Sequence, residues 1–355
     1  ETVDTVLTWF PSHKSPRAAQ SVDEMLASTR QWWQDWATTC TPPGAYDEHV
    51  RRSLLVLRAL THESTGGIVA APTTSLPEEI GGGRNWDYRY VWIRDAALTL
   101  ESLMIHGYQQ EASAWRDWLL RAIAGDPEDI QIMYGLSGER YLYERELTSL
   151  PGYEGSGPVR VGNGAYDQFQ GDIFGELMIA LEDARELGVH EDDFSWSLQV
   201  RLLDWVSTQL DRTDNGIWEI RGELRTFTHS RAMLWAAFDR GIRAVEKFEL
   251  PASIEGWVAA RDRLRAEIEE RGYDSERGHY VQHYDTTEVD ASLLQLAQIG
   301  YVAYDDERML GTVAEIERTL LRKGLPLRYR TESGVDGLEG DEHPFVTCAF
   351  WLVEQ

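Results

Sequence analysis

The sequence predicts an all-helical protein, and three observations support this. Apolar residues recur every three to four positions along most of the 355-residue chain, which is the spacing of one buried helix face. Alternation of apolar and polar residues, which is typical of strands, is scarce, and residues 220–227 are the candidate for a short hairpin. No succession of strand–helix–strand units occurs, so a parallel sheet is not expected.

About eleven helical stretches account for this pattern. Two of them end at a glycine, Gly107 and Gly188, the residue that commonly follows a helix because it adopts the left-handed conformation freely. The last stretch is apolar on most faces and has no cap or polar tail before Gln355, so we expect the natural protein to continue past this residue. In chain order the expected helices are 22–39, 53–60, 95–106, 110–124, 166–187, 198–210, 228–247, 253–270, 290–298, 307–322 and 342–355.

A single helical domain explains these stretches most simply. Neither a fixed-period repeat nor a low-complexity linker interrupts the chain. The alternative is a pair of unrelated helical domains that are separated near residues 190–194.

Composition limits the partners and the compartment. Sixty acidic and 34 basic residues give a formal net charge of −26, which repels nucleic acids and anionic membranes but does not affect neutral ligands such as sugars. Cys40 and Cys348 allow at most one disulfide bond, which suits a reducing compartment. A leader peptide and a long apolar run are both lacking, so we expect a cytoplasmic protein without a membrane span. The sequence does not predict the oligomeric state.

The densest cluster of polar and aromatic residues is the loop 81–95. It begins with three glycines, which let a backbone approach a ligand closely, and it contains Trp92, Arg94 and Asp95. Aromatic faces stack on sugar rings, while arginine and aspartate side chains bind hydroxyl groups. In the structural alternative, the aromatic residues pack in the core and Asp95 caps the following helix.

A second candidate site is the turn 213–221. Its Asp-Asn-Gly sequence favours a turn that places Glu219 beside Trp218. A carboxyl that is held against an indole and shielded from water has a raised pKa, which a general acid needs near neutral pH. Arg221 opposes this shift if it lies close. The alternative is an ordinary surface glutamate that follows a turn.

A third candidate site is the acidic turn 336–345. A carboxylate that stays ionised near the N-terminus of the last helix can act as a base, whereas the alternative is that Asp341 and Glu342 cap that helix. Two carboxyls in aromatic loops suggest glycoside hydrolysis. In that reaction one carboxyl protonates the leaving oxygen, and the other activates water or attacks carbon.

No metal or cofactor is expected. His279 and His283 are four residues apart, but Tyr280 stands where a zinc protease helix carries its glutamate. The two histidines are therefore interpreted as surface or packing residues.

Together and in order, these motifs resemble glycoside hydrolase family 15, the glucoamylase-like enzymes, in their bacterial form. The resemblance covers nearly the whole chain. The matching segments are 71–78, 81–95, 152–153, 158–165, 216–219, 340–342 and 348–353.

The resemblance implies an (α/α)6 barrel, which is a toroid of six inner and six outer helices with the site at one mouth. It assigns residues 1–44 to a linker and first helix, and residues 45–355 to the catalytic barrel. The barrel would then lack its last helix, and the N-terminal β-sandwich of bacterial members would be missing.

The resemblance also implies roles for individual residues. By this resemblance, Glu219 corresponds to the general acid of the family and Glu342 to its general base. Because the family inverts the anomeric centre, these two carboxyls should lie about 6.5–9.5 Å apart. His343–Pro344 stands where bacterial members more often have glycine and a small residue, which adds bulk beside the base. The residues implied to bind the terminal glucose are Trp92, Arg94, Asp95, Trp218 and Arg221.

The implied activity is that of an exo-acting, inverting α-glucosidase that releases glucose from the non-reducing ends of α-glucans or oligosaccharides. One alternative is an α,α-trehalase, because bacterial relatives include such enzymes and the motifs for the first glucose are shared. An alternative of another class is a carbohydrate-binding relative without catalysis.

Overall fold

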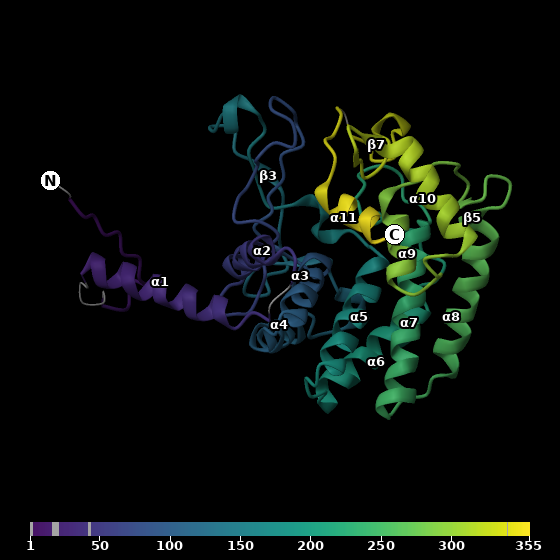
Figure 1. Cartoon of the computed structure of the whole chain (residues 1–355), viewed down its shortest axis with the longest axis horizontal. Coiled ribbons are helices and arrows are strands. Elements are labelled where there is room, and N and C mark those ends of the chain that lie inside the picture. Colours follow the sequence, from purple (N-terminus) through teal and green to yellow (C-terminus); the bar gives the residue numbers. More distant parts are fainter. Residues whose placement is uncertain (1–2, 16–20, 42–43, 339) are drawn as a thin grey trace.

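Helices dominate the computed structural model, which describes residues 3–15, 21–41, 44–338 and 340–355 (Figure 1). Four small antiparallel pairs of two-residue strands connect them. The helices are α1 (Val22–Thr38), α2 (Asp47–Leu60), α3 (Ile93–Ile105), α4 (Gln109–Ala122), α5 (Asp172–Glu186), α6 (Asp193–Ser207), α7 (Thr228–Phe248), α8 (Glu255–Glu267), α9 (Gln295–Gln298), α10 (Glu307–Leu320) and α11 (Val346–Glu354). The strands pair as β1 (Val91–Trp92) with β2 (Met133–Tyr134), β3 (Arg145–Glu146) with β4 (Arg160–Val161), β5 (Tyr273–Asp274) with β6 (His279–Tyr280), and β7 (Leu321–Arg322) with β8 (Leu325–Pro326).

The helices form an inner and an outer set. α5 packs against α3 and α7 and is buried around most of its circumference, as is α7. The outer α10 instead buries one stripe at helical spacing, made of Met309, Thr312, Ile316 and Leu320. One hydrophobic core extends from Ile68 to Trp351 and includes residues on both sides of positions 190–194.

Glycine permits the close approach of the two central helices. A Cβ atom at Gly175 of α5 would lie 2.5 Å from the carbonyl oxygen of Met233 on α7, which is closer than real Cβ atoms come. Because α5 and α7 pack this closely and α5 also packs against α3, the loops that precede these helices are attached to closely packed elements.

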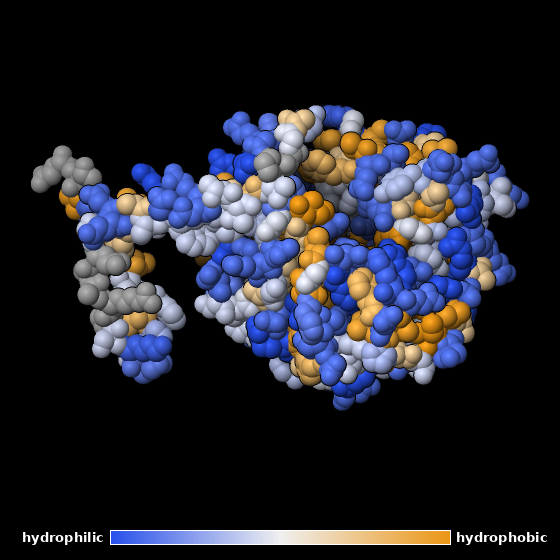
Figure 2. Space-filling view, turned by 60° about the horizontal axis from the view of Figure 1, so that its bottom comes forward, coloured by the Kyte–Doolittle hydropathy of each residue, from blue (hydrophilic) through white to orange (hydrophobic). Residues whose placement is uncertain are grey.

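The N-terminal helix projects from the body of the molecule (Figures 1 and 2). α1 has no buried residue, and its C-terminal end is attached through Trp36, which stacks on Tyr108 with ring centroids 4.0 Å apart and donates a hydrogen bond to Glu111. Cys40 and Cys348 are both buried and unpaired with each other. None of the helices in the described ranges has the length and apolar character needed to span a membrane.

Several local expectations need correction. The helix expected at 198–210 is α6, which begins at Asp193, and the stretch 290–298 is a 3₁₀ turn at Ala291–Leu294 followed by the short α9. The second helix begins at Asp47 rather than at 53. The stretch 166–187 is not one helix: a 3₁₀ turn at Gly164–Asp167 is followed by α5, which begins at Asp172. The residues between them bind the turn before α7 instead. Gly171 N–H donates to the Asp214 carboxylate, and the Phe169 carbonyl accepts from Asn215 N–H. Residues 220–227 form no hairpin: Arg225 and Phe227 instead make single bridges to Asp214 and His283.

The last correction concerns the C-terminal helix, which begins at Val346 rather than at 342. Pro344 disfavours helical backbone at the residue before it, so His343 cannot continue a helix. Asp341 and Glu342 therefore do not cap α11, and Pro344 precedes its N-cap residue, Phe345.

Candidate active site

A pocket of about 580 Å³ opens where the loops that precede α3, α5, α7 and α11 meet. Its wall combines aromatic side chains with arginines and carboxyls, a composition suited to stacking on sugar rings and binding their hydroxyl groups. Glu342 is buried beside the pocket but does not line it. The residues predicted from sequence that do line it are Trp92, Arg94, Asp95, Trp218, Glu219 and Arg221.

The turn before α7 presents Glu219 from a strained backbone. The φ angle of Glu219 is +57°, in the left-handed region, which costs a non-glycine residue about 1 kcal/mol. The turn is held by hydrogen bonds from Glu219 N–H to the Gly216 carbonyl (3.1 Å) and from the Asn215 side-chain amide to the Ile220 carbonyl (2.9 Å). Backbone strain of this kind is concentrated at functional sites. Here it accompanies a carboxyl that points into the pocket.

The Glu219 carboxyl is largely enclosed, with 20% of its side chain exposed. Its Oε1 accepts hydrogen bonds from Trp92 Nε1 at 2.6 Å and from Arg94 Nη2 at 3.2 Å. Burial raises the pKa of Glu219, Arg94 opposes the rise, and Asp95 reinforces it. The indole that contacts this carboxyl is therefore that of Trp92, whereas the sequence suggested Trp218.

Arg94 connects the pocket to the buried helices. Its Nη2 contacts Glu219 and lies 3.6 Å from Asp95, while its Nη1 lies 3.3 Å from both Gln170 and Asp172. Asp95 lies in the first turn of α3 and its side chain is 42% exposed, so it faces the pocket and is not the N-cap residue, which is Trp92. Arg94 and Asp95 thus present paired charges to the pocket.

Trp218 forms the adjacent wall. Its Nε1 donates a hydrogen bond of 2.9 Å to Asp290, which is 1% exposed and also accepts one from the Ser292 hydroxyl at 2.6 Å. Burial raises the pKa of Asp290 to about 6. The Trp218 ring also packs near Tyr329 and Trp351, so its orientation is fixed from three sides.

Glu342 reaches the pocket through Arg328. The Glu342 carboxylate accepts from Arg328 Nε at 2.9 Å, from Arg328 Nη2 and from the Arg328 backbone N–H at 3.2 Å. Burial raises the pKa of Glu342, and Arg328 opposes that rise. Arg328 itself lines the pocket and lies 3.4 Å from Glu78, a second carboxyl in the wall.

Arg221 lines the pocket with its charge already paired. It binds Glu144 through both terminal nitrogens, at 2.7 and 3.1 Å, and its guanidinium lies 4.2 Å from the centre of the Trp86 ring. It is not a partner of Glu219 in this structure, so Arg94 is the arginine that opposes the raised pKa of Glu219.

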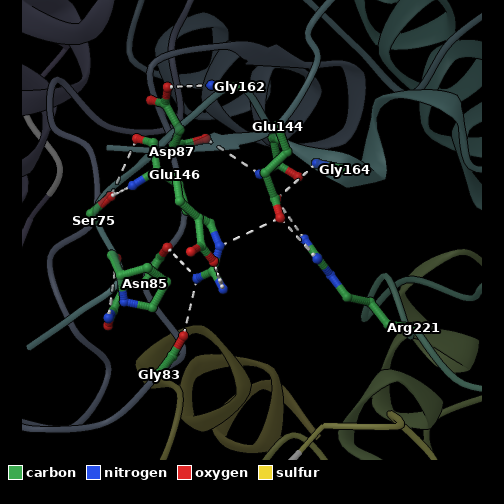
Figure 3. A network of polar contacts seen from close by, with 12 residues as sticks. Ser75, Gly83, Asn85, Asp87, Glu144, Glu146, Gly162, Gly164 and Arg221 are labelled. Carbon is green, nitrogen blue, oxygen red and sulfur yellow. Dashed lines mark hydrogen bonds and ion pairs between the residues drawn. The ribbon is translucent and has the colours of Figure 1, made fainter. Parts of the chain in front are cut away.

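A network of polar contacts fixes the loop 81–95 against the strand pair β3–β4 (Figure 3). Asp87 accepts from Gly162 N–H at 3.1 Å, and Glu144 accepts from Gly164 N–H at 2.9 Å. The Arg160 guanidinium donates to the carbonyls of Gly83 and Asn85 at 3.1 and 3.0 Å. These hydrogen bonds hold the loop that leads to Trp92 and Arg94 against β3–β4.

Comparison with known proteins identifies the family. The family model for glycosyl hydrolases family 15 matches residues 44–355.

The chain belongs to this family.

It is 38% identical over 330 residues to a trehalase of Thermoplasma volcanium, covering 93% of this chain and 52% of that protein. It is 37% identical over 355 residues to a trehalase of Mycobacterium tuberculosis, covering 99% and 52%. A bacterial glucoamylase solved in complex with acarbose superimposes with a TM-score of 0.65 at 16% identity, over 88% of this chain and 46% of that one. The chain thus spans about half the length of the curated relatives it matches.

These findings confirm the expected family and the expected (α/α)6 fold class. Sequence reasoning missed residues that contact the pocket residues from other segments: Arg328, Glu78, Asp290 and Asp172. Arg328 and Glu78 lie outside the acidic motifs that we singled out, and their common feature, a contact with each other across 250 positions, is visible only in the fold.

Proposed function

We propose that this family 15 chain carries the catalytic site of an inverting glycoside hydrolase that cleaves α,α-trehalose, with Glu219 as the general acid. The observation that supports the acid most strongly is its environment: an enclosed carboxyl with a raised pKa that points into a pocket of about 580 Å³. A carboxyl that keeps its proton near neutral pH can deliver it to the oxygen of the leaving sugar. The pocket lies within the size range of small-ligand sites, roughly 300–1,000 Å³.

The relatives favour trehalose over the α-glucans that the sequence alone put first. Proteins named trehalase are 37–38% identical over 93–99% of this chain, whereas the glucoamylase likeness, at 16% identity, concerns the fold. A neutral disaccharide also suits a chain with a net charge of −26.

The first glucose ring is assigned to the wall around Arg94. In this proposal Arg94 and Asp95 bind its hydroxyls, and Trp92 and Trp218 confine the ring. Arg221, which is paired with Glu144, contributes by holding the Trp86 ring in the wall. Within the chain, residues 45–355 form the catalytic domain and residues 1–44 the linker and first helix.

The general base is assigned to Glu342. Three hydrogen bonds from Arg328 favour the ionised form of this carboxyl, and a base must be ionised to accept a proton from water. Glu219 instead shares its arginine, Arg94, with Asp172 and Asp95, and the charge of Asp95 reinforces the rise in the pKa of Glu219. This contrast supports the assignment of acid and base. Glu78 is the competing base, because it lines the pocket and pairs with the same Arg328.

A substrate panel tests the proposal. The full-length natural protein is incubated with trehalose, maltose, isomaltose and starch, and glucose release is measured. We expect trehalose to be hydrolysed with the highest kcat/KM. Release from maltose or starch in preference to trehalose would support the glucan reading. Saturable binding of trehalose without any hydrolysis would support the non-catalytic alternative.

A further inference from the structure

The contact between Arg94 and Glu219 conflicts with the role of an acid. A guanidinium at 3.2 Å from a carboxyl favours its ionised form, and a general acid must hold its proton until the reaction begins. Arg94 is also needed in the pocket wall. Some group must therefore offset its charge on the side away from the ligand.

Asp172 lies at that position. It is the first residue of α5, it is fully buried, and its Oδ2 lies 3.3 Å from Arg94 Nη1. One guanidinium thus separates the Asp172 carboxylate from the Glu219 carboxyl. Burial of an ionised carboxylate is unfavourable unless it is paired, and Arg94 is the cation with which Asp172 forms an ion pair.

We propose that Asp172 is a positioning residue of the candidate site: by pairing with Nη1 of Arg94, its carboxylate offsets the guanidinium charge that Glu219 would otherwise experience, and so keeps Glu219 protonated. This inference rests on the proposed role of Glu219 as the general acid. It extends that role to a residue that the ligand cannot reach, because Asp172 has no exposed surface.

The other titratable groups around Asp172 and Arg94 are less able to play this part. On α5, burial raises the pKa of Glu176 to about 8, so this group is largely protonated at neutral pH. In the turn before α7, burial raises the pKa of Asp214 to about 7, so this group carries only part of a charge there. On α7, burial lowers the pKa of His229 to about 4, which leaves it neutral. In the loop before α3, burial raises the pKa of Tyr88, which therefore stays neutral.

Asp95 is the remaining charge near Arg94, but water reaches it. Its side chain is 42% exposed, and it lies 3.6 Å from Nη2 on the pocket side. Solvent screens an exposed pair of this kind. Asp95 therefore acts on the pocket side of the guanidinium, where solvent is present, whereas the fully buried Asp172 acts on the side away from the pocket.

The test is Asp172→Asn, with the ionisation of Glu219 as the readout. Trp92 Nε1–H donates to the Glu219 carboxyl, so the NMR signal of this indole, identified by its loss in Trp92→Phe, follows the titration of Glu219. We expect the transition in this signal, and the alkaline limb of the kcat/KM profile for trehalose, to move to lower pH by about one pH unit. The control is Glu182→Gln. Glu182 lies ten residues after Asp172 on α5, and its buried carboxylate pairs with Arg240 of α7. This substitution should leave both transitions in place.

A second substitution protects the test against a loss of folding. Gln170 accepts from the same Arg94 Nη1 at 3.3 Å, so Gln170→Glu adds a carboxylate at this nitrogen. Alone it should move the Glu219 transition to higher pH, and combined with Asp172→Asn it should restore the original position. Unchanged transitions in Asp172→Asn and in Gln170→Glu would overturn the inference.

The indole signal distinguishes the inference from the proposed function. Absence of trehalose hydrolysis by the unsubstituted full-length protein, with the indole transitions moving as expected, would refute the substrate while keeping the role of Asp172. Normal hydrolysis with transitions that do not move would refute the role of Asp172 alone.

Discussion

Glu219→Gln is expected to lower kcat for trehalose about 10³-fold while KM changes little. The amide keeps the size of the side chain and its ability to accept from Trp92 Nε1, but it has no proton of suitable acidity for the leaving oxygen. The alkaline limb of the pH profile should also disappear, because that limb reports the loss of the Glu219 proton. The sign follows from the raised pKa: the acid form persists above the usual carboxyl range, and activity falls as pH rises through the pKa of Glu219.

The matched control is Glu223→Gln. Glu223 lies four residues further along the same loop, and its side chain is 87% exposed. Its substitution should leave kcat and KM as they are. A Glu219→Gln protein that keeps normal turnover would eliminate Glu219 as the acid.

Glu342→Gln is expected to reduce kcat to a similar extent and also to destabilise the fold. Water would lose the carboxylate that accepts its proton, and Arg328 would lose its main buried partner, which costs about 3 kcal/mol. Azide, a nucleophile that needs no base, should restore turnover and yield a glucosyl azide, while urea unfolding should show the loss in stability. A purely structural role would lower stability without azide rescue.

Glu78→Gln decides between the two candidate bases. Glu78 is paired with the same arginine, so its substitution perturbs Arg328 in a comparable way. We expect a modest change in KM and no response to azide. A larger loss of kcat in Glu78→Gln than in Glu342→Gln, with rescue by azide, would transfer the role of base to Glu78.

The sequence predicts the helices well because their cause is local. The stripe of Met309, Ile316 and Leu320 on α10 follows directly from apolar spacing. Two helix starts that were predicted wrongly depend on a contact from elsewhere or on a neighbouring proline. Gly171 is held by Asp214, 43 residues later, and Pro344 excludes His343 from α11.

The candidate site was predicted only in part, because some of its contacts are local in sequence and others are not. Glu219 stands out because its turn and its aromatic neighbour are adjacent in sequence. Its real indole partner, Trp92, is 127 positions away, and Arg328, which binds Glu342, belongs to no motif that sequence reasoning recognised. Charges that offset one another across helices, such as Asp172 and Arg94, become evident only when the helices are packed.

The anomeric form of the released glucose tests the pair of carboxyls most directly. In hydrolysis of α,α-trehalose by inversion, the attacked glucose leaves as the β-anomer and the other glucose keeps its α-configuration. Proton NMR of the full-length protein with trehalose, recorded before mutarotation, should therefore show equal amounts of α- and β-glucose. Release of α-glucose alone would require a carboxyl that attacks carbon, and would contradict an acid at Glu219 that acts opposite a water-activating base.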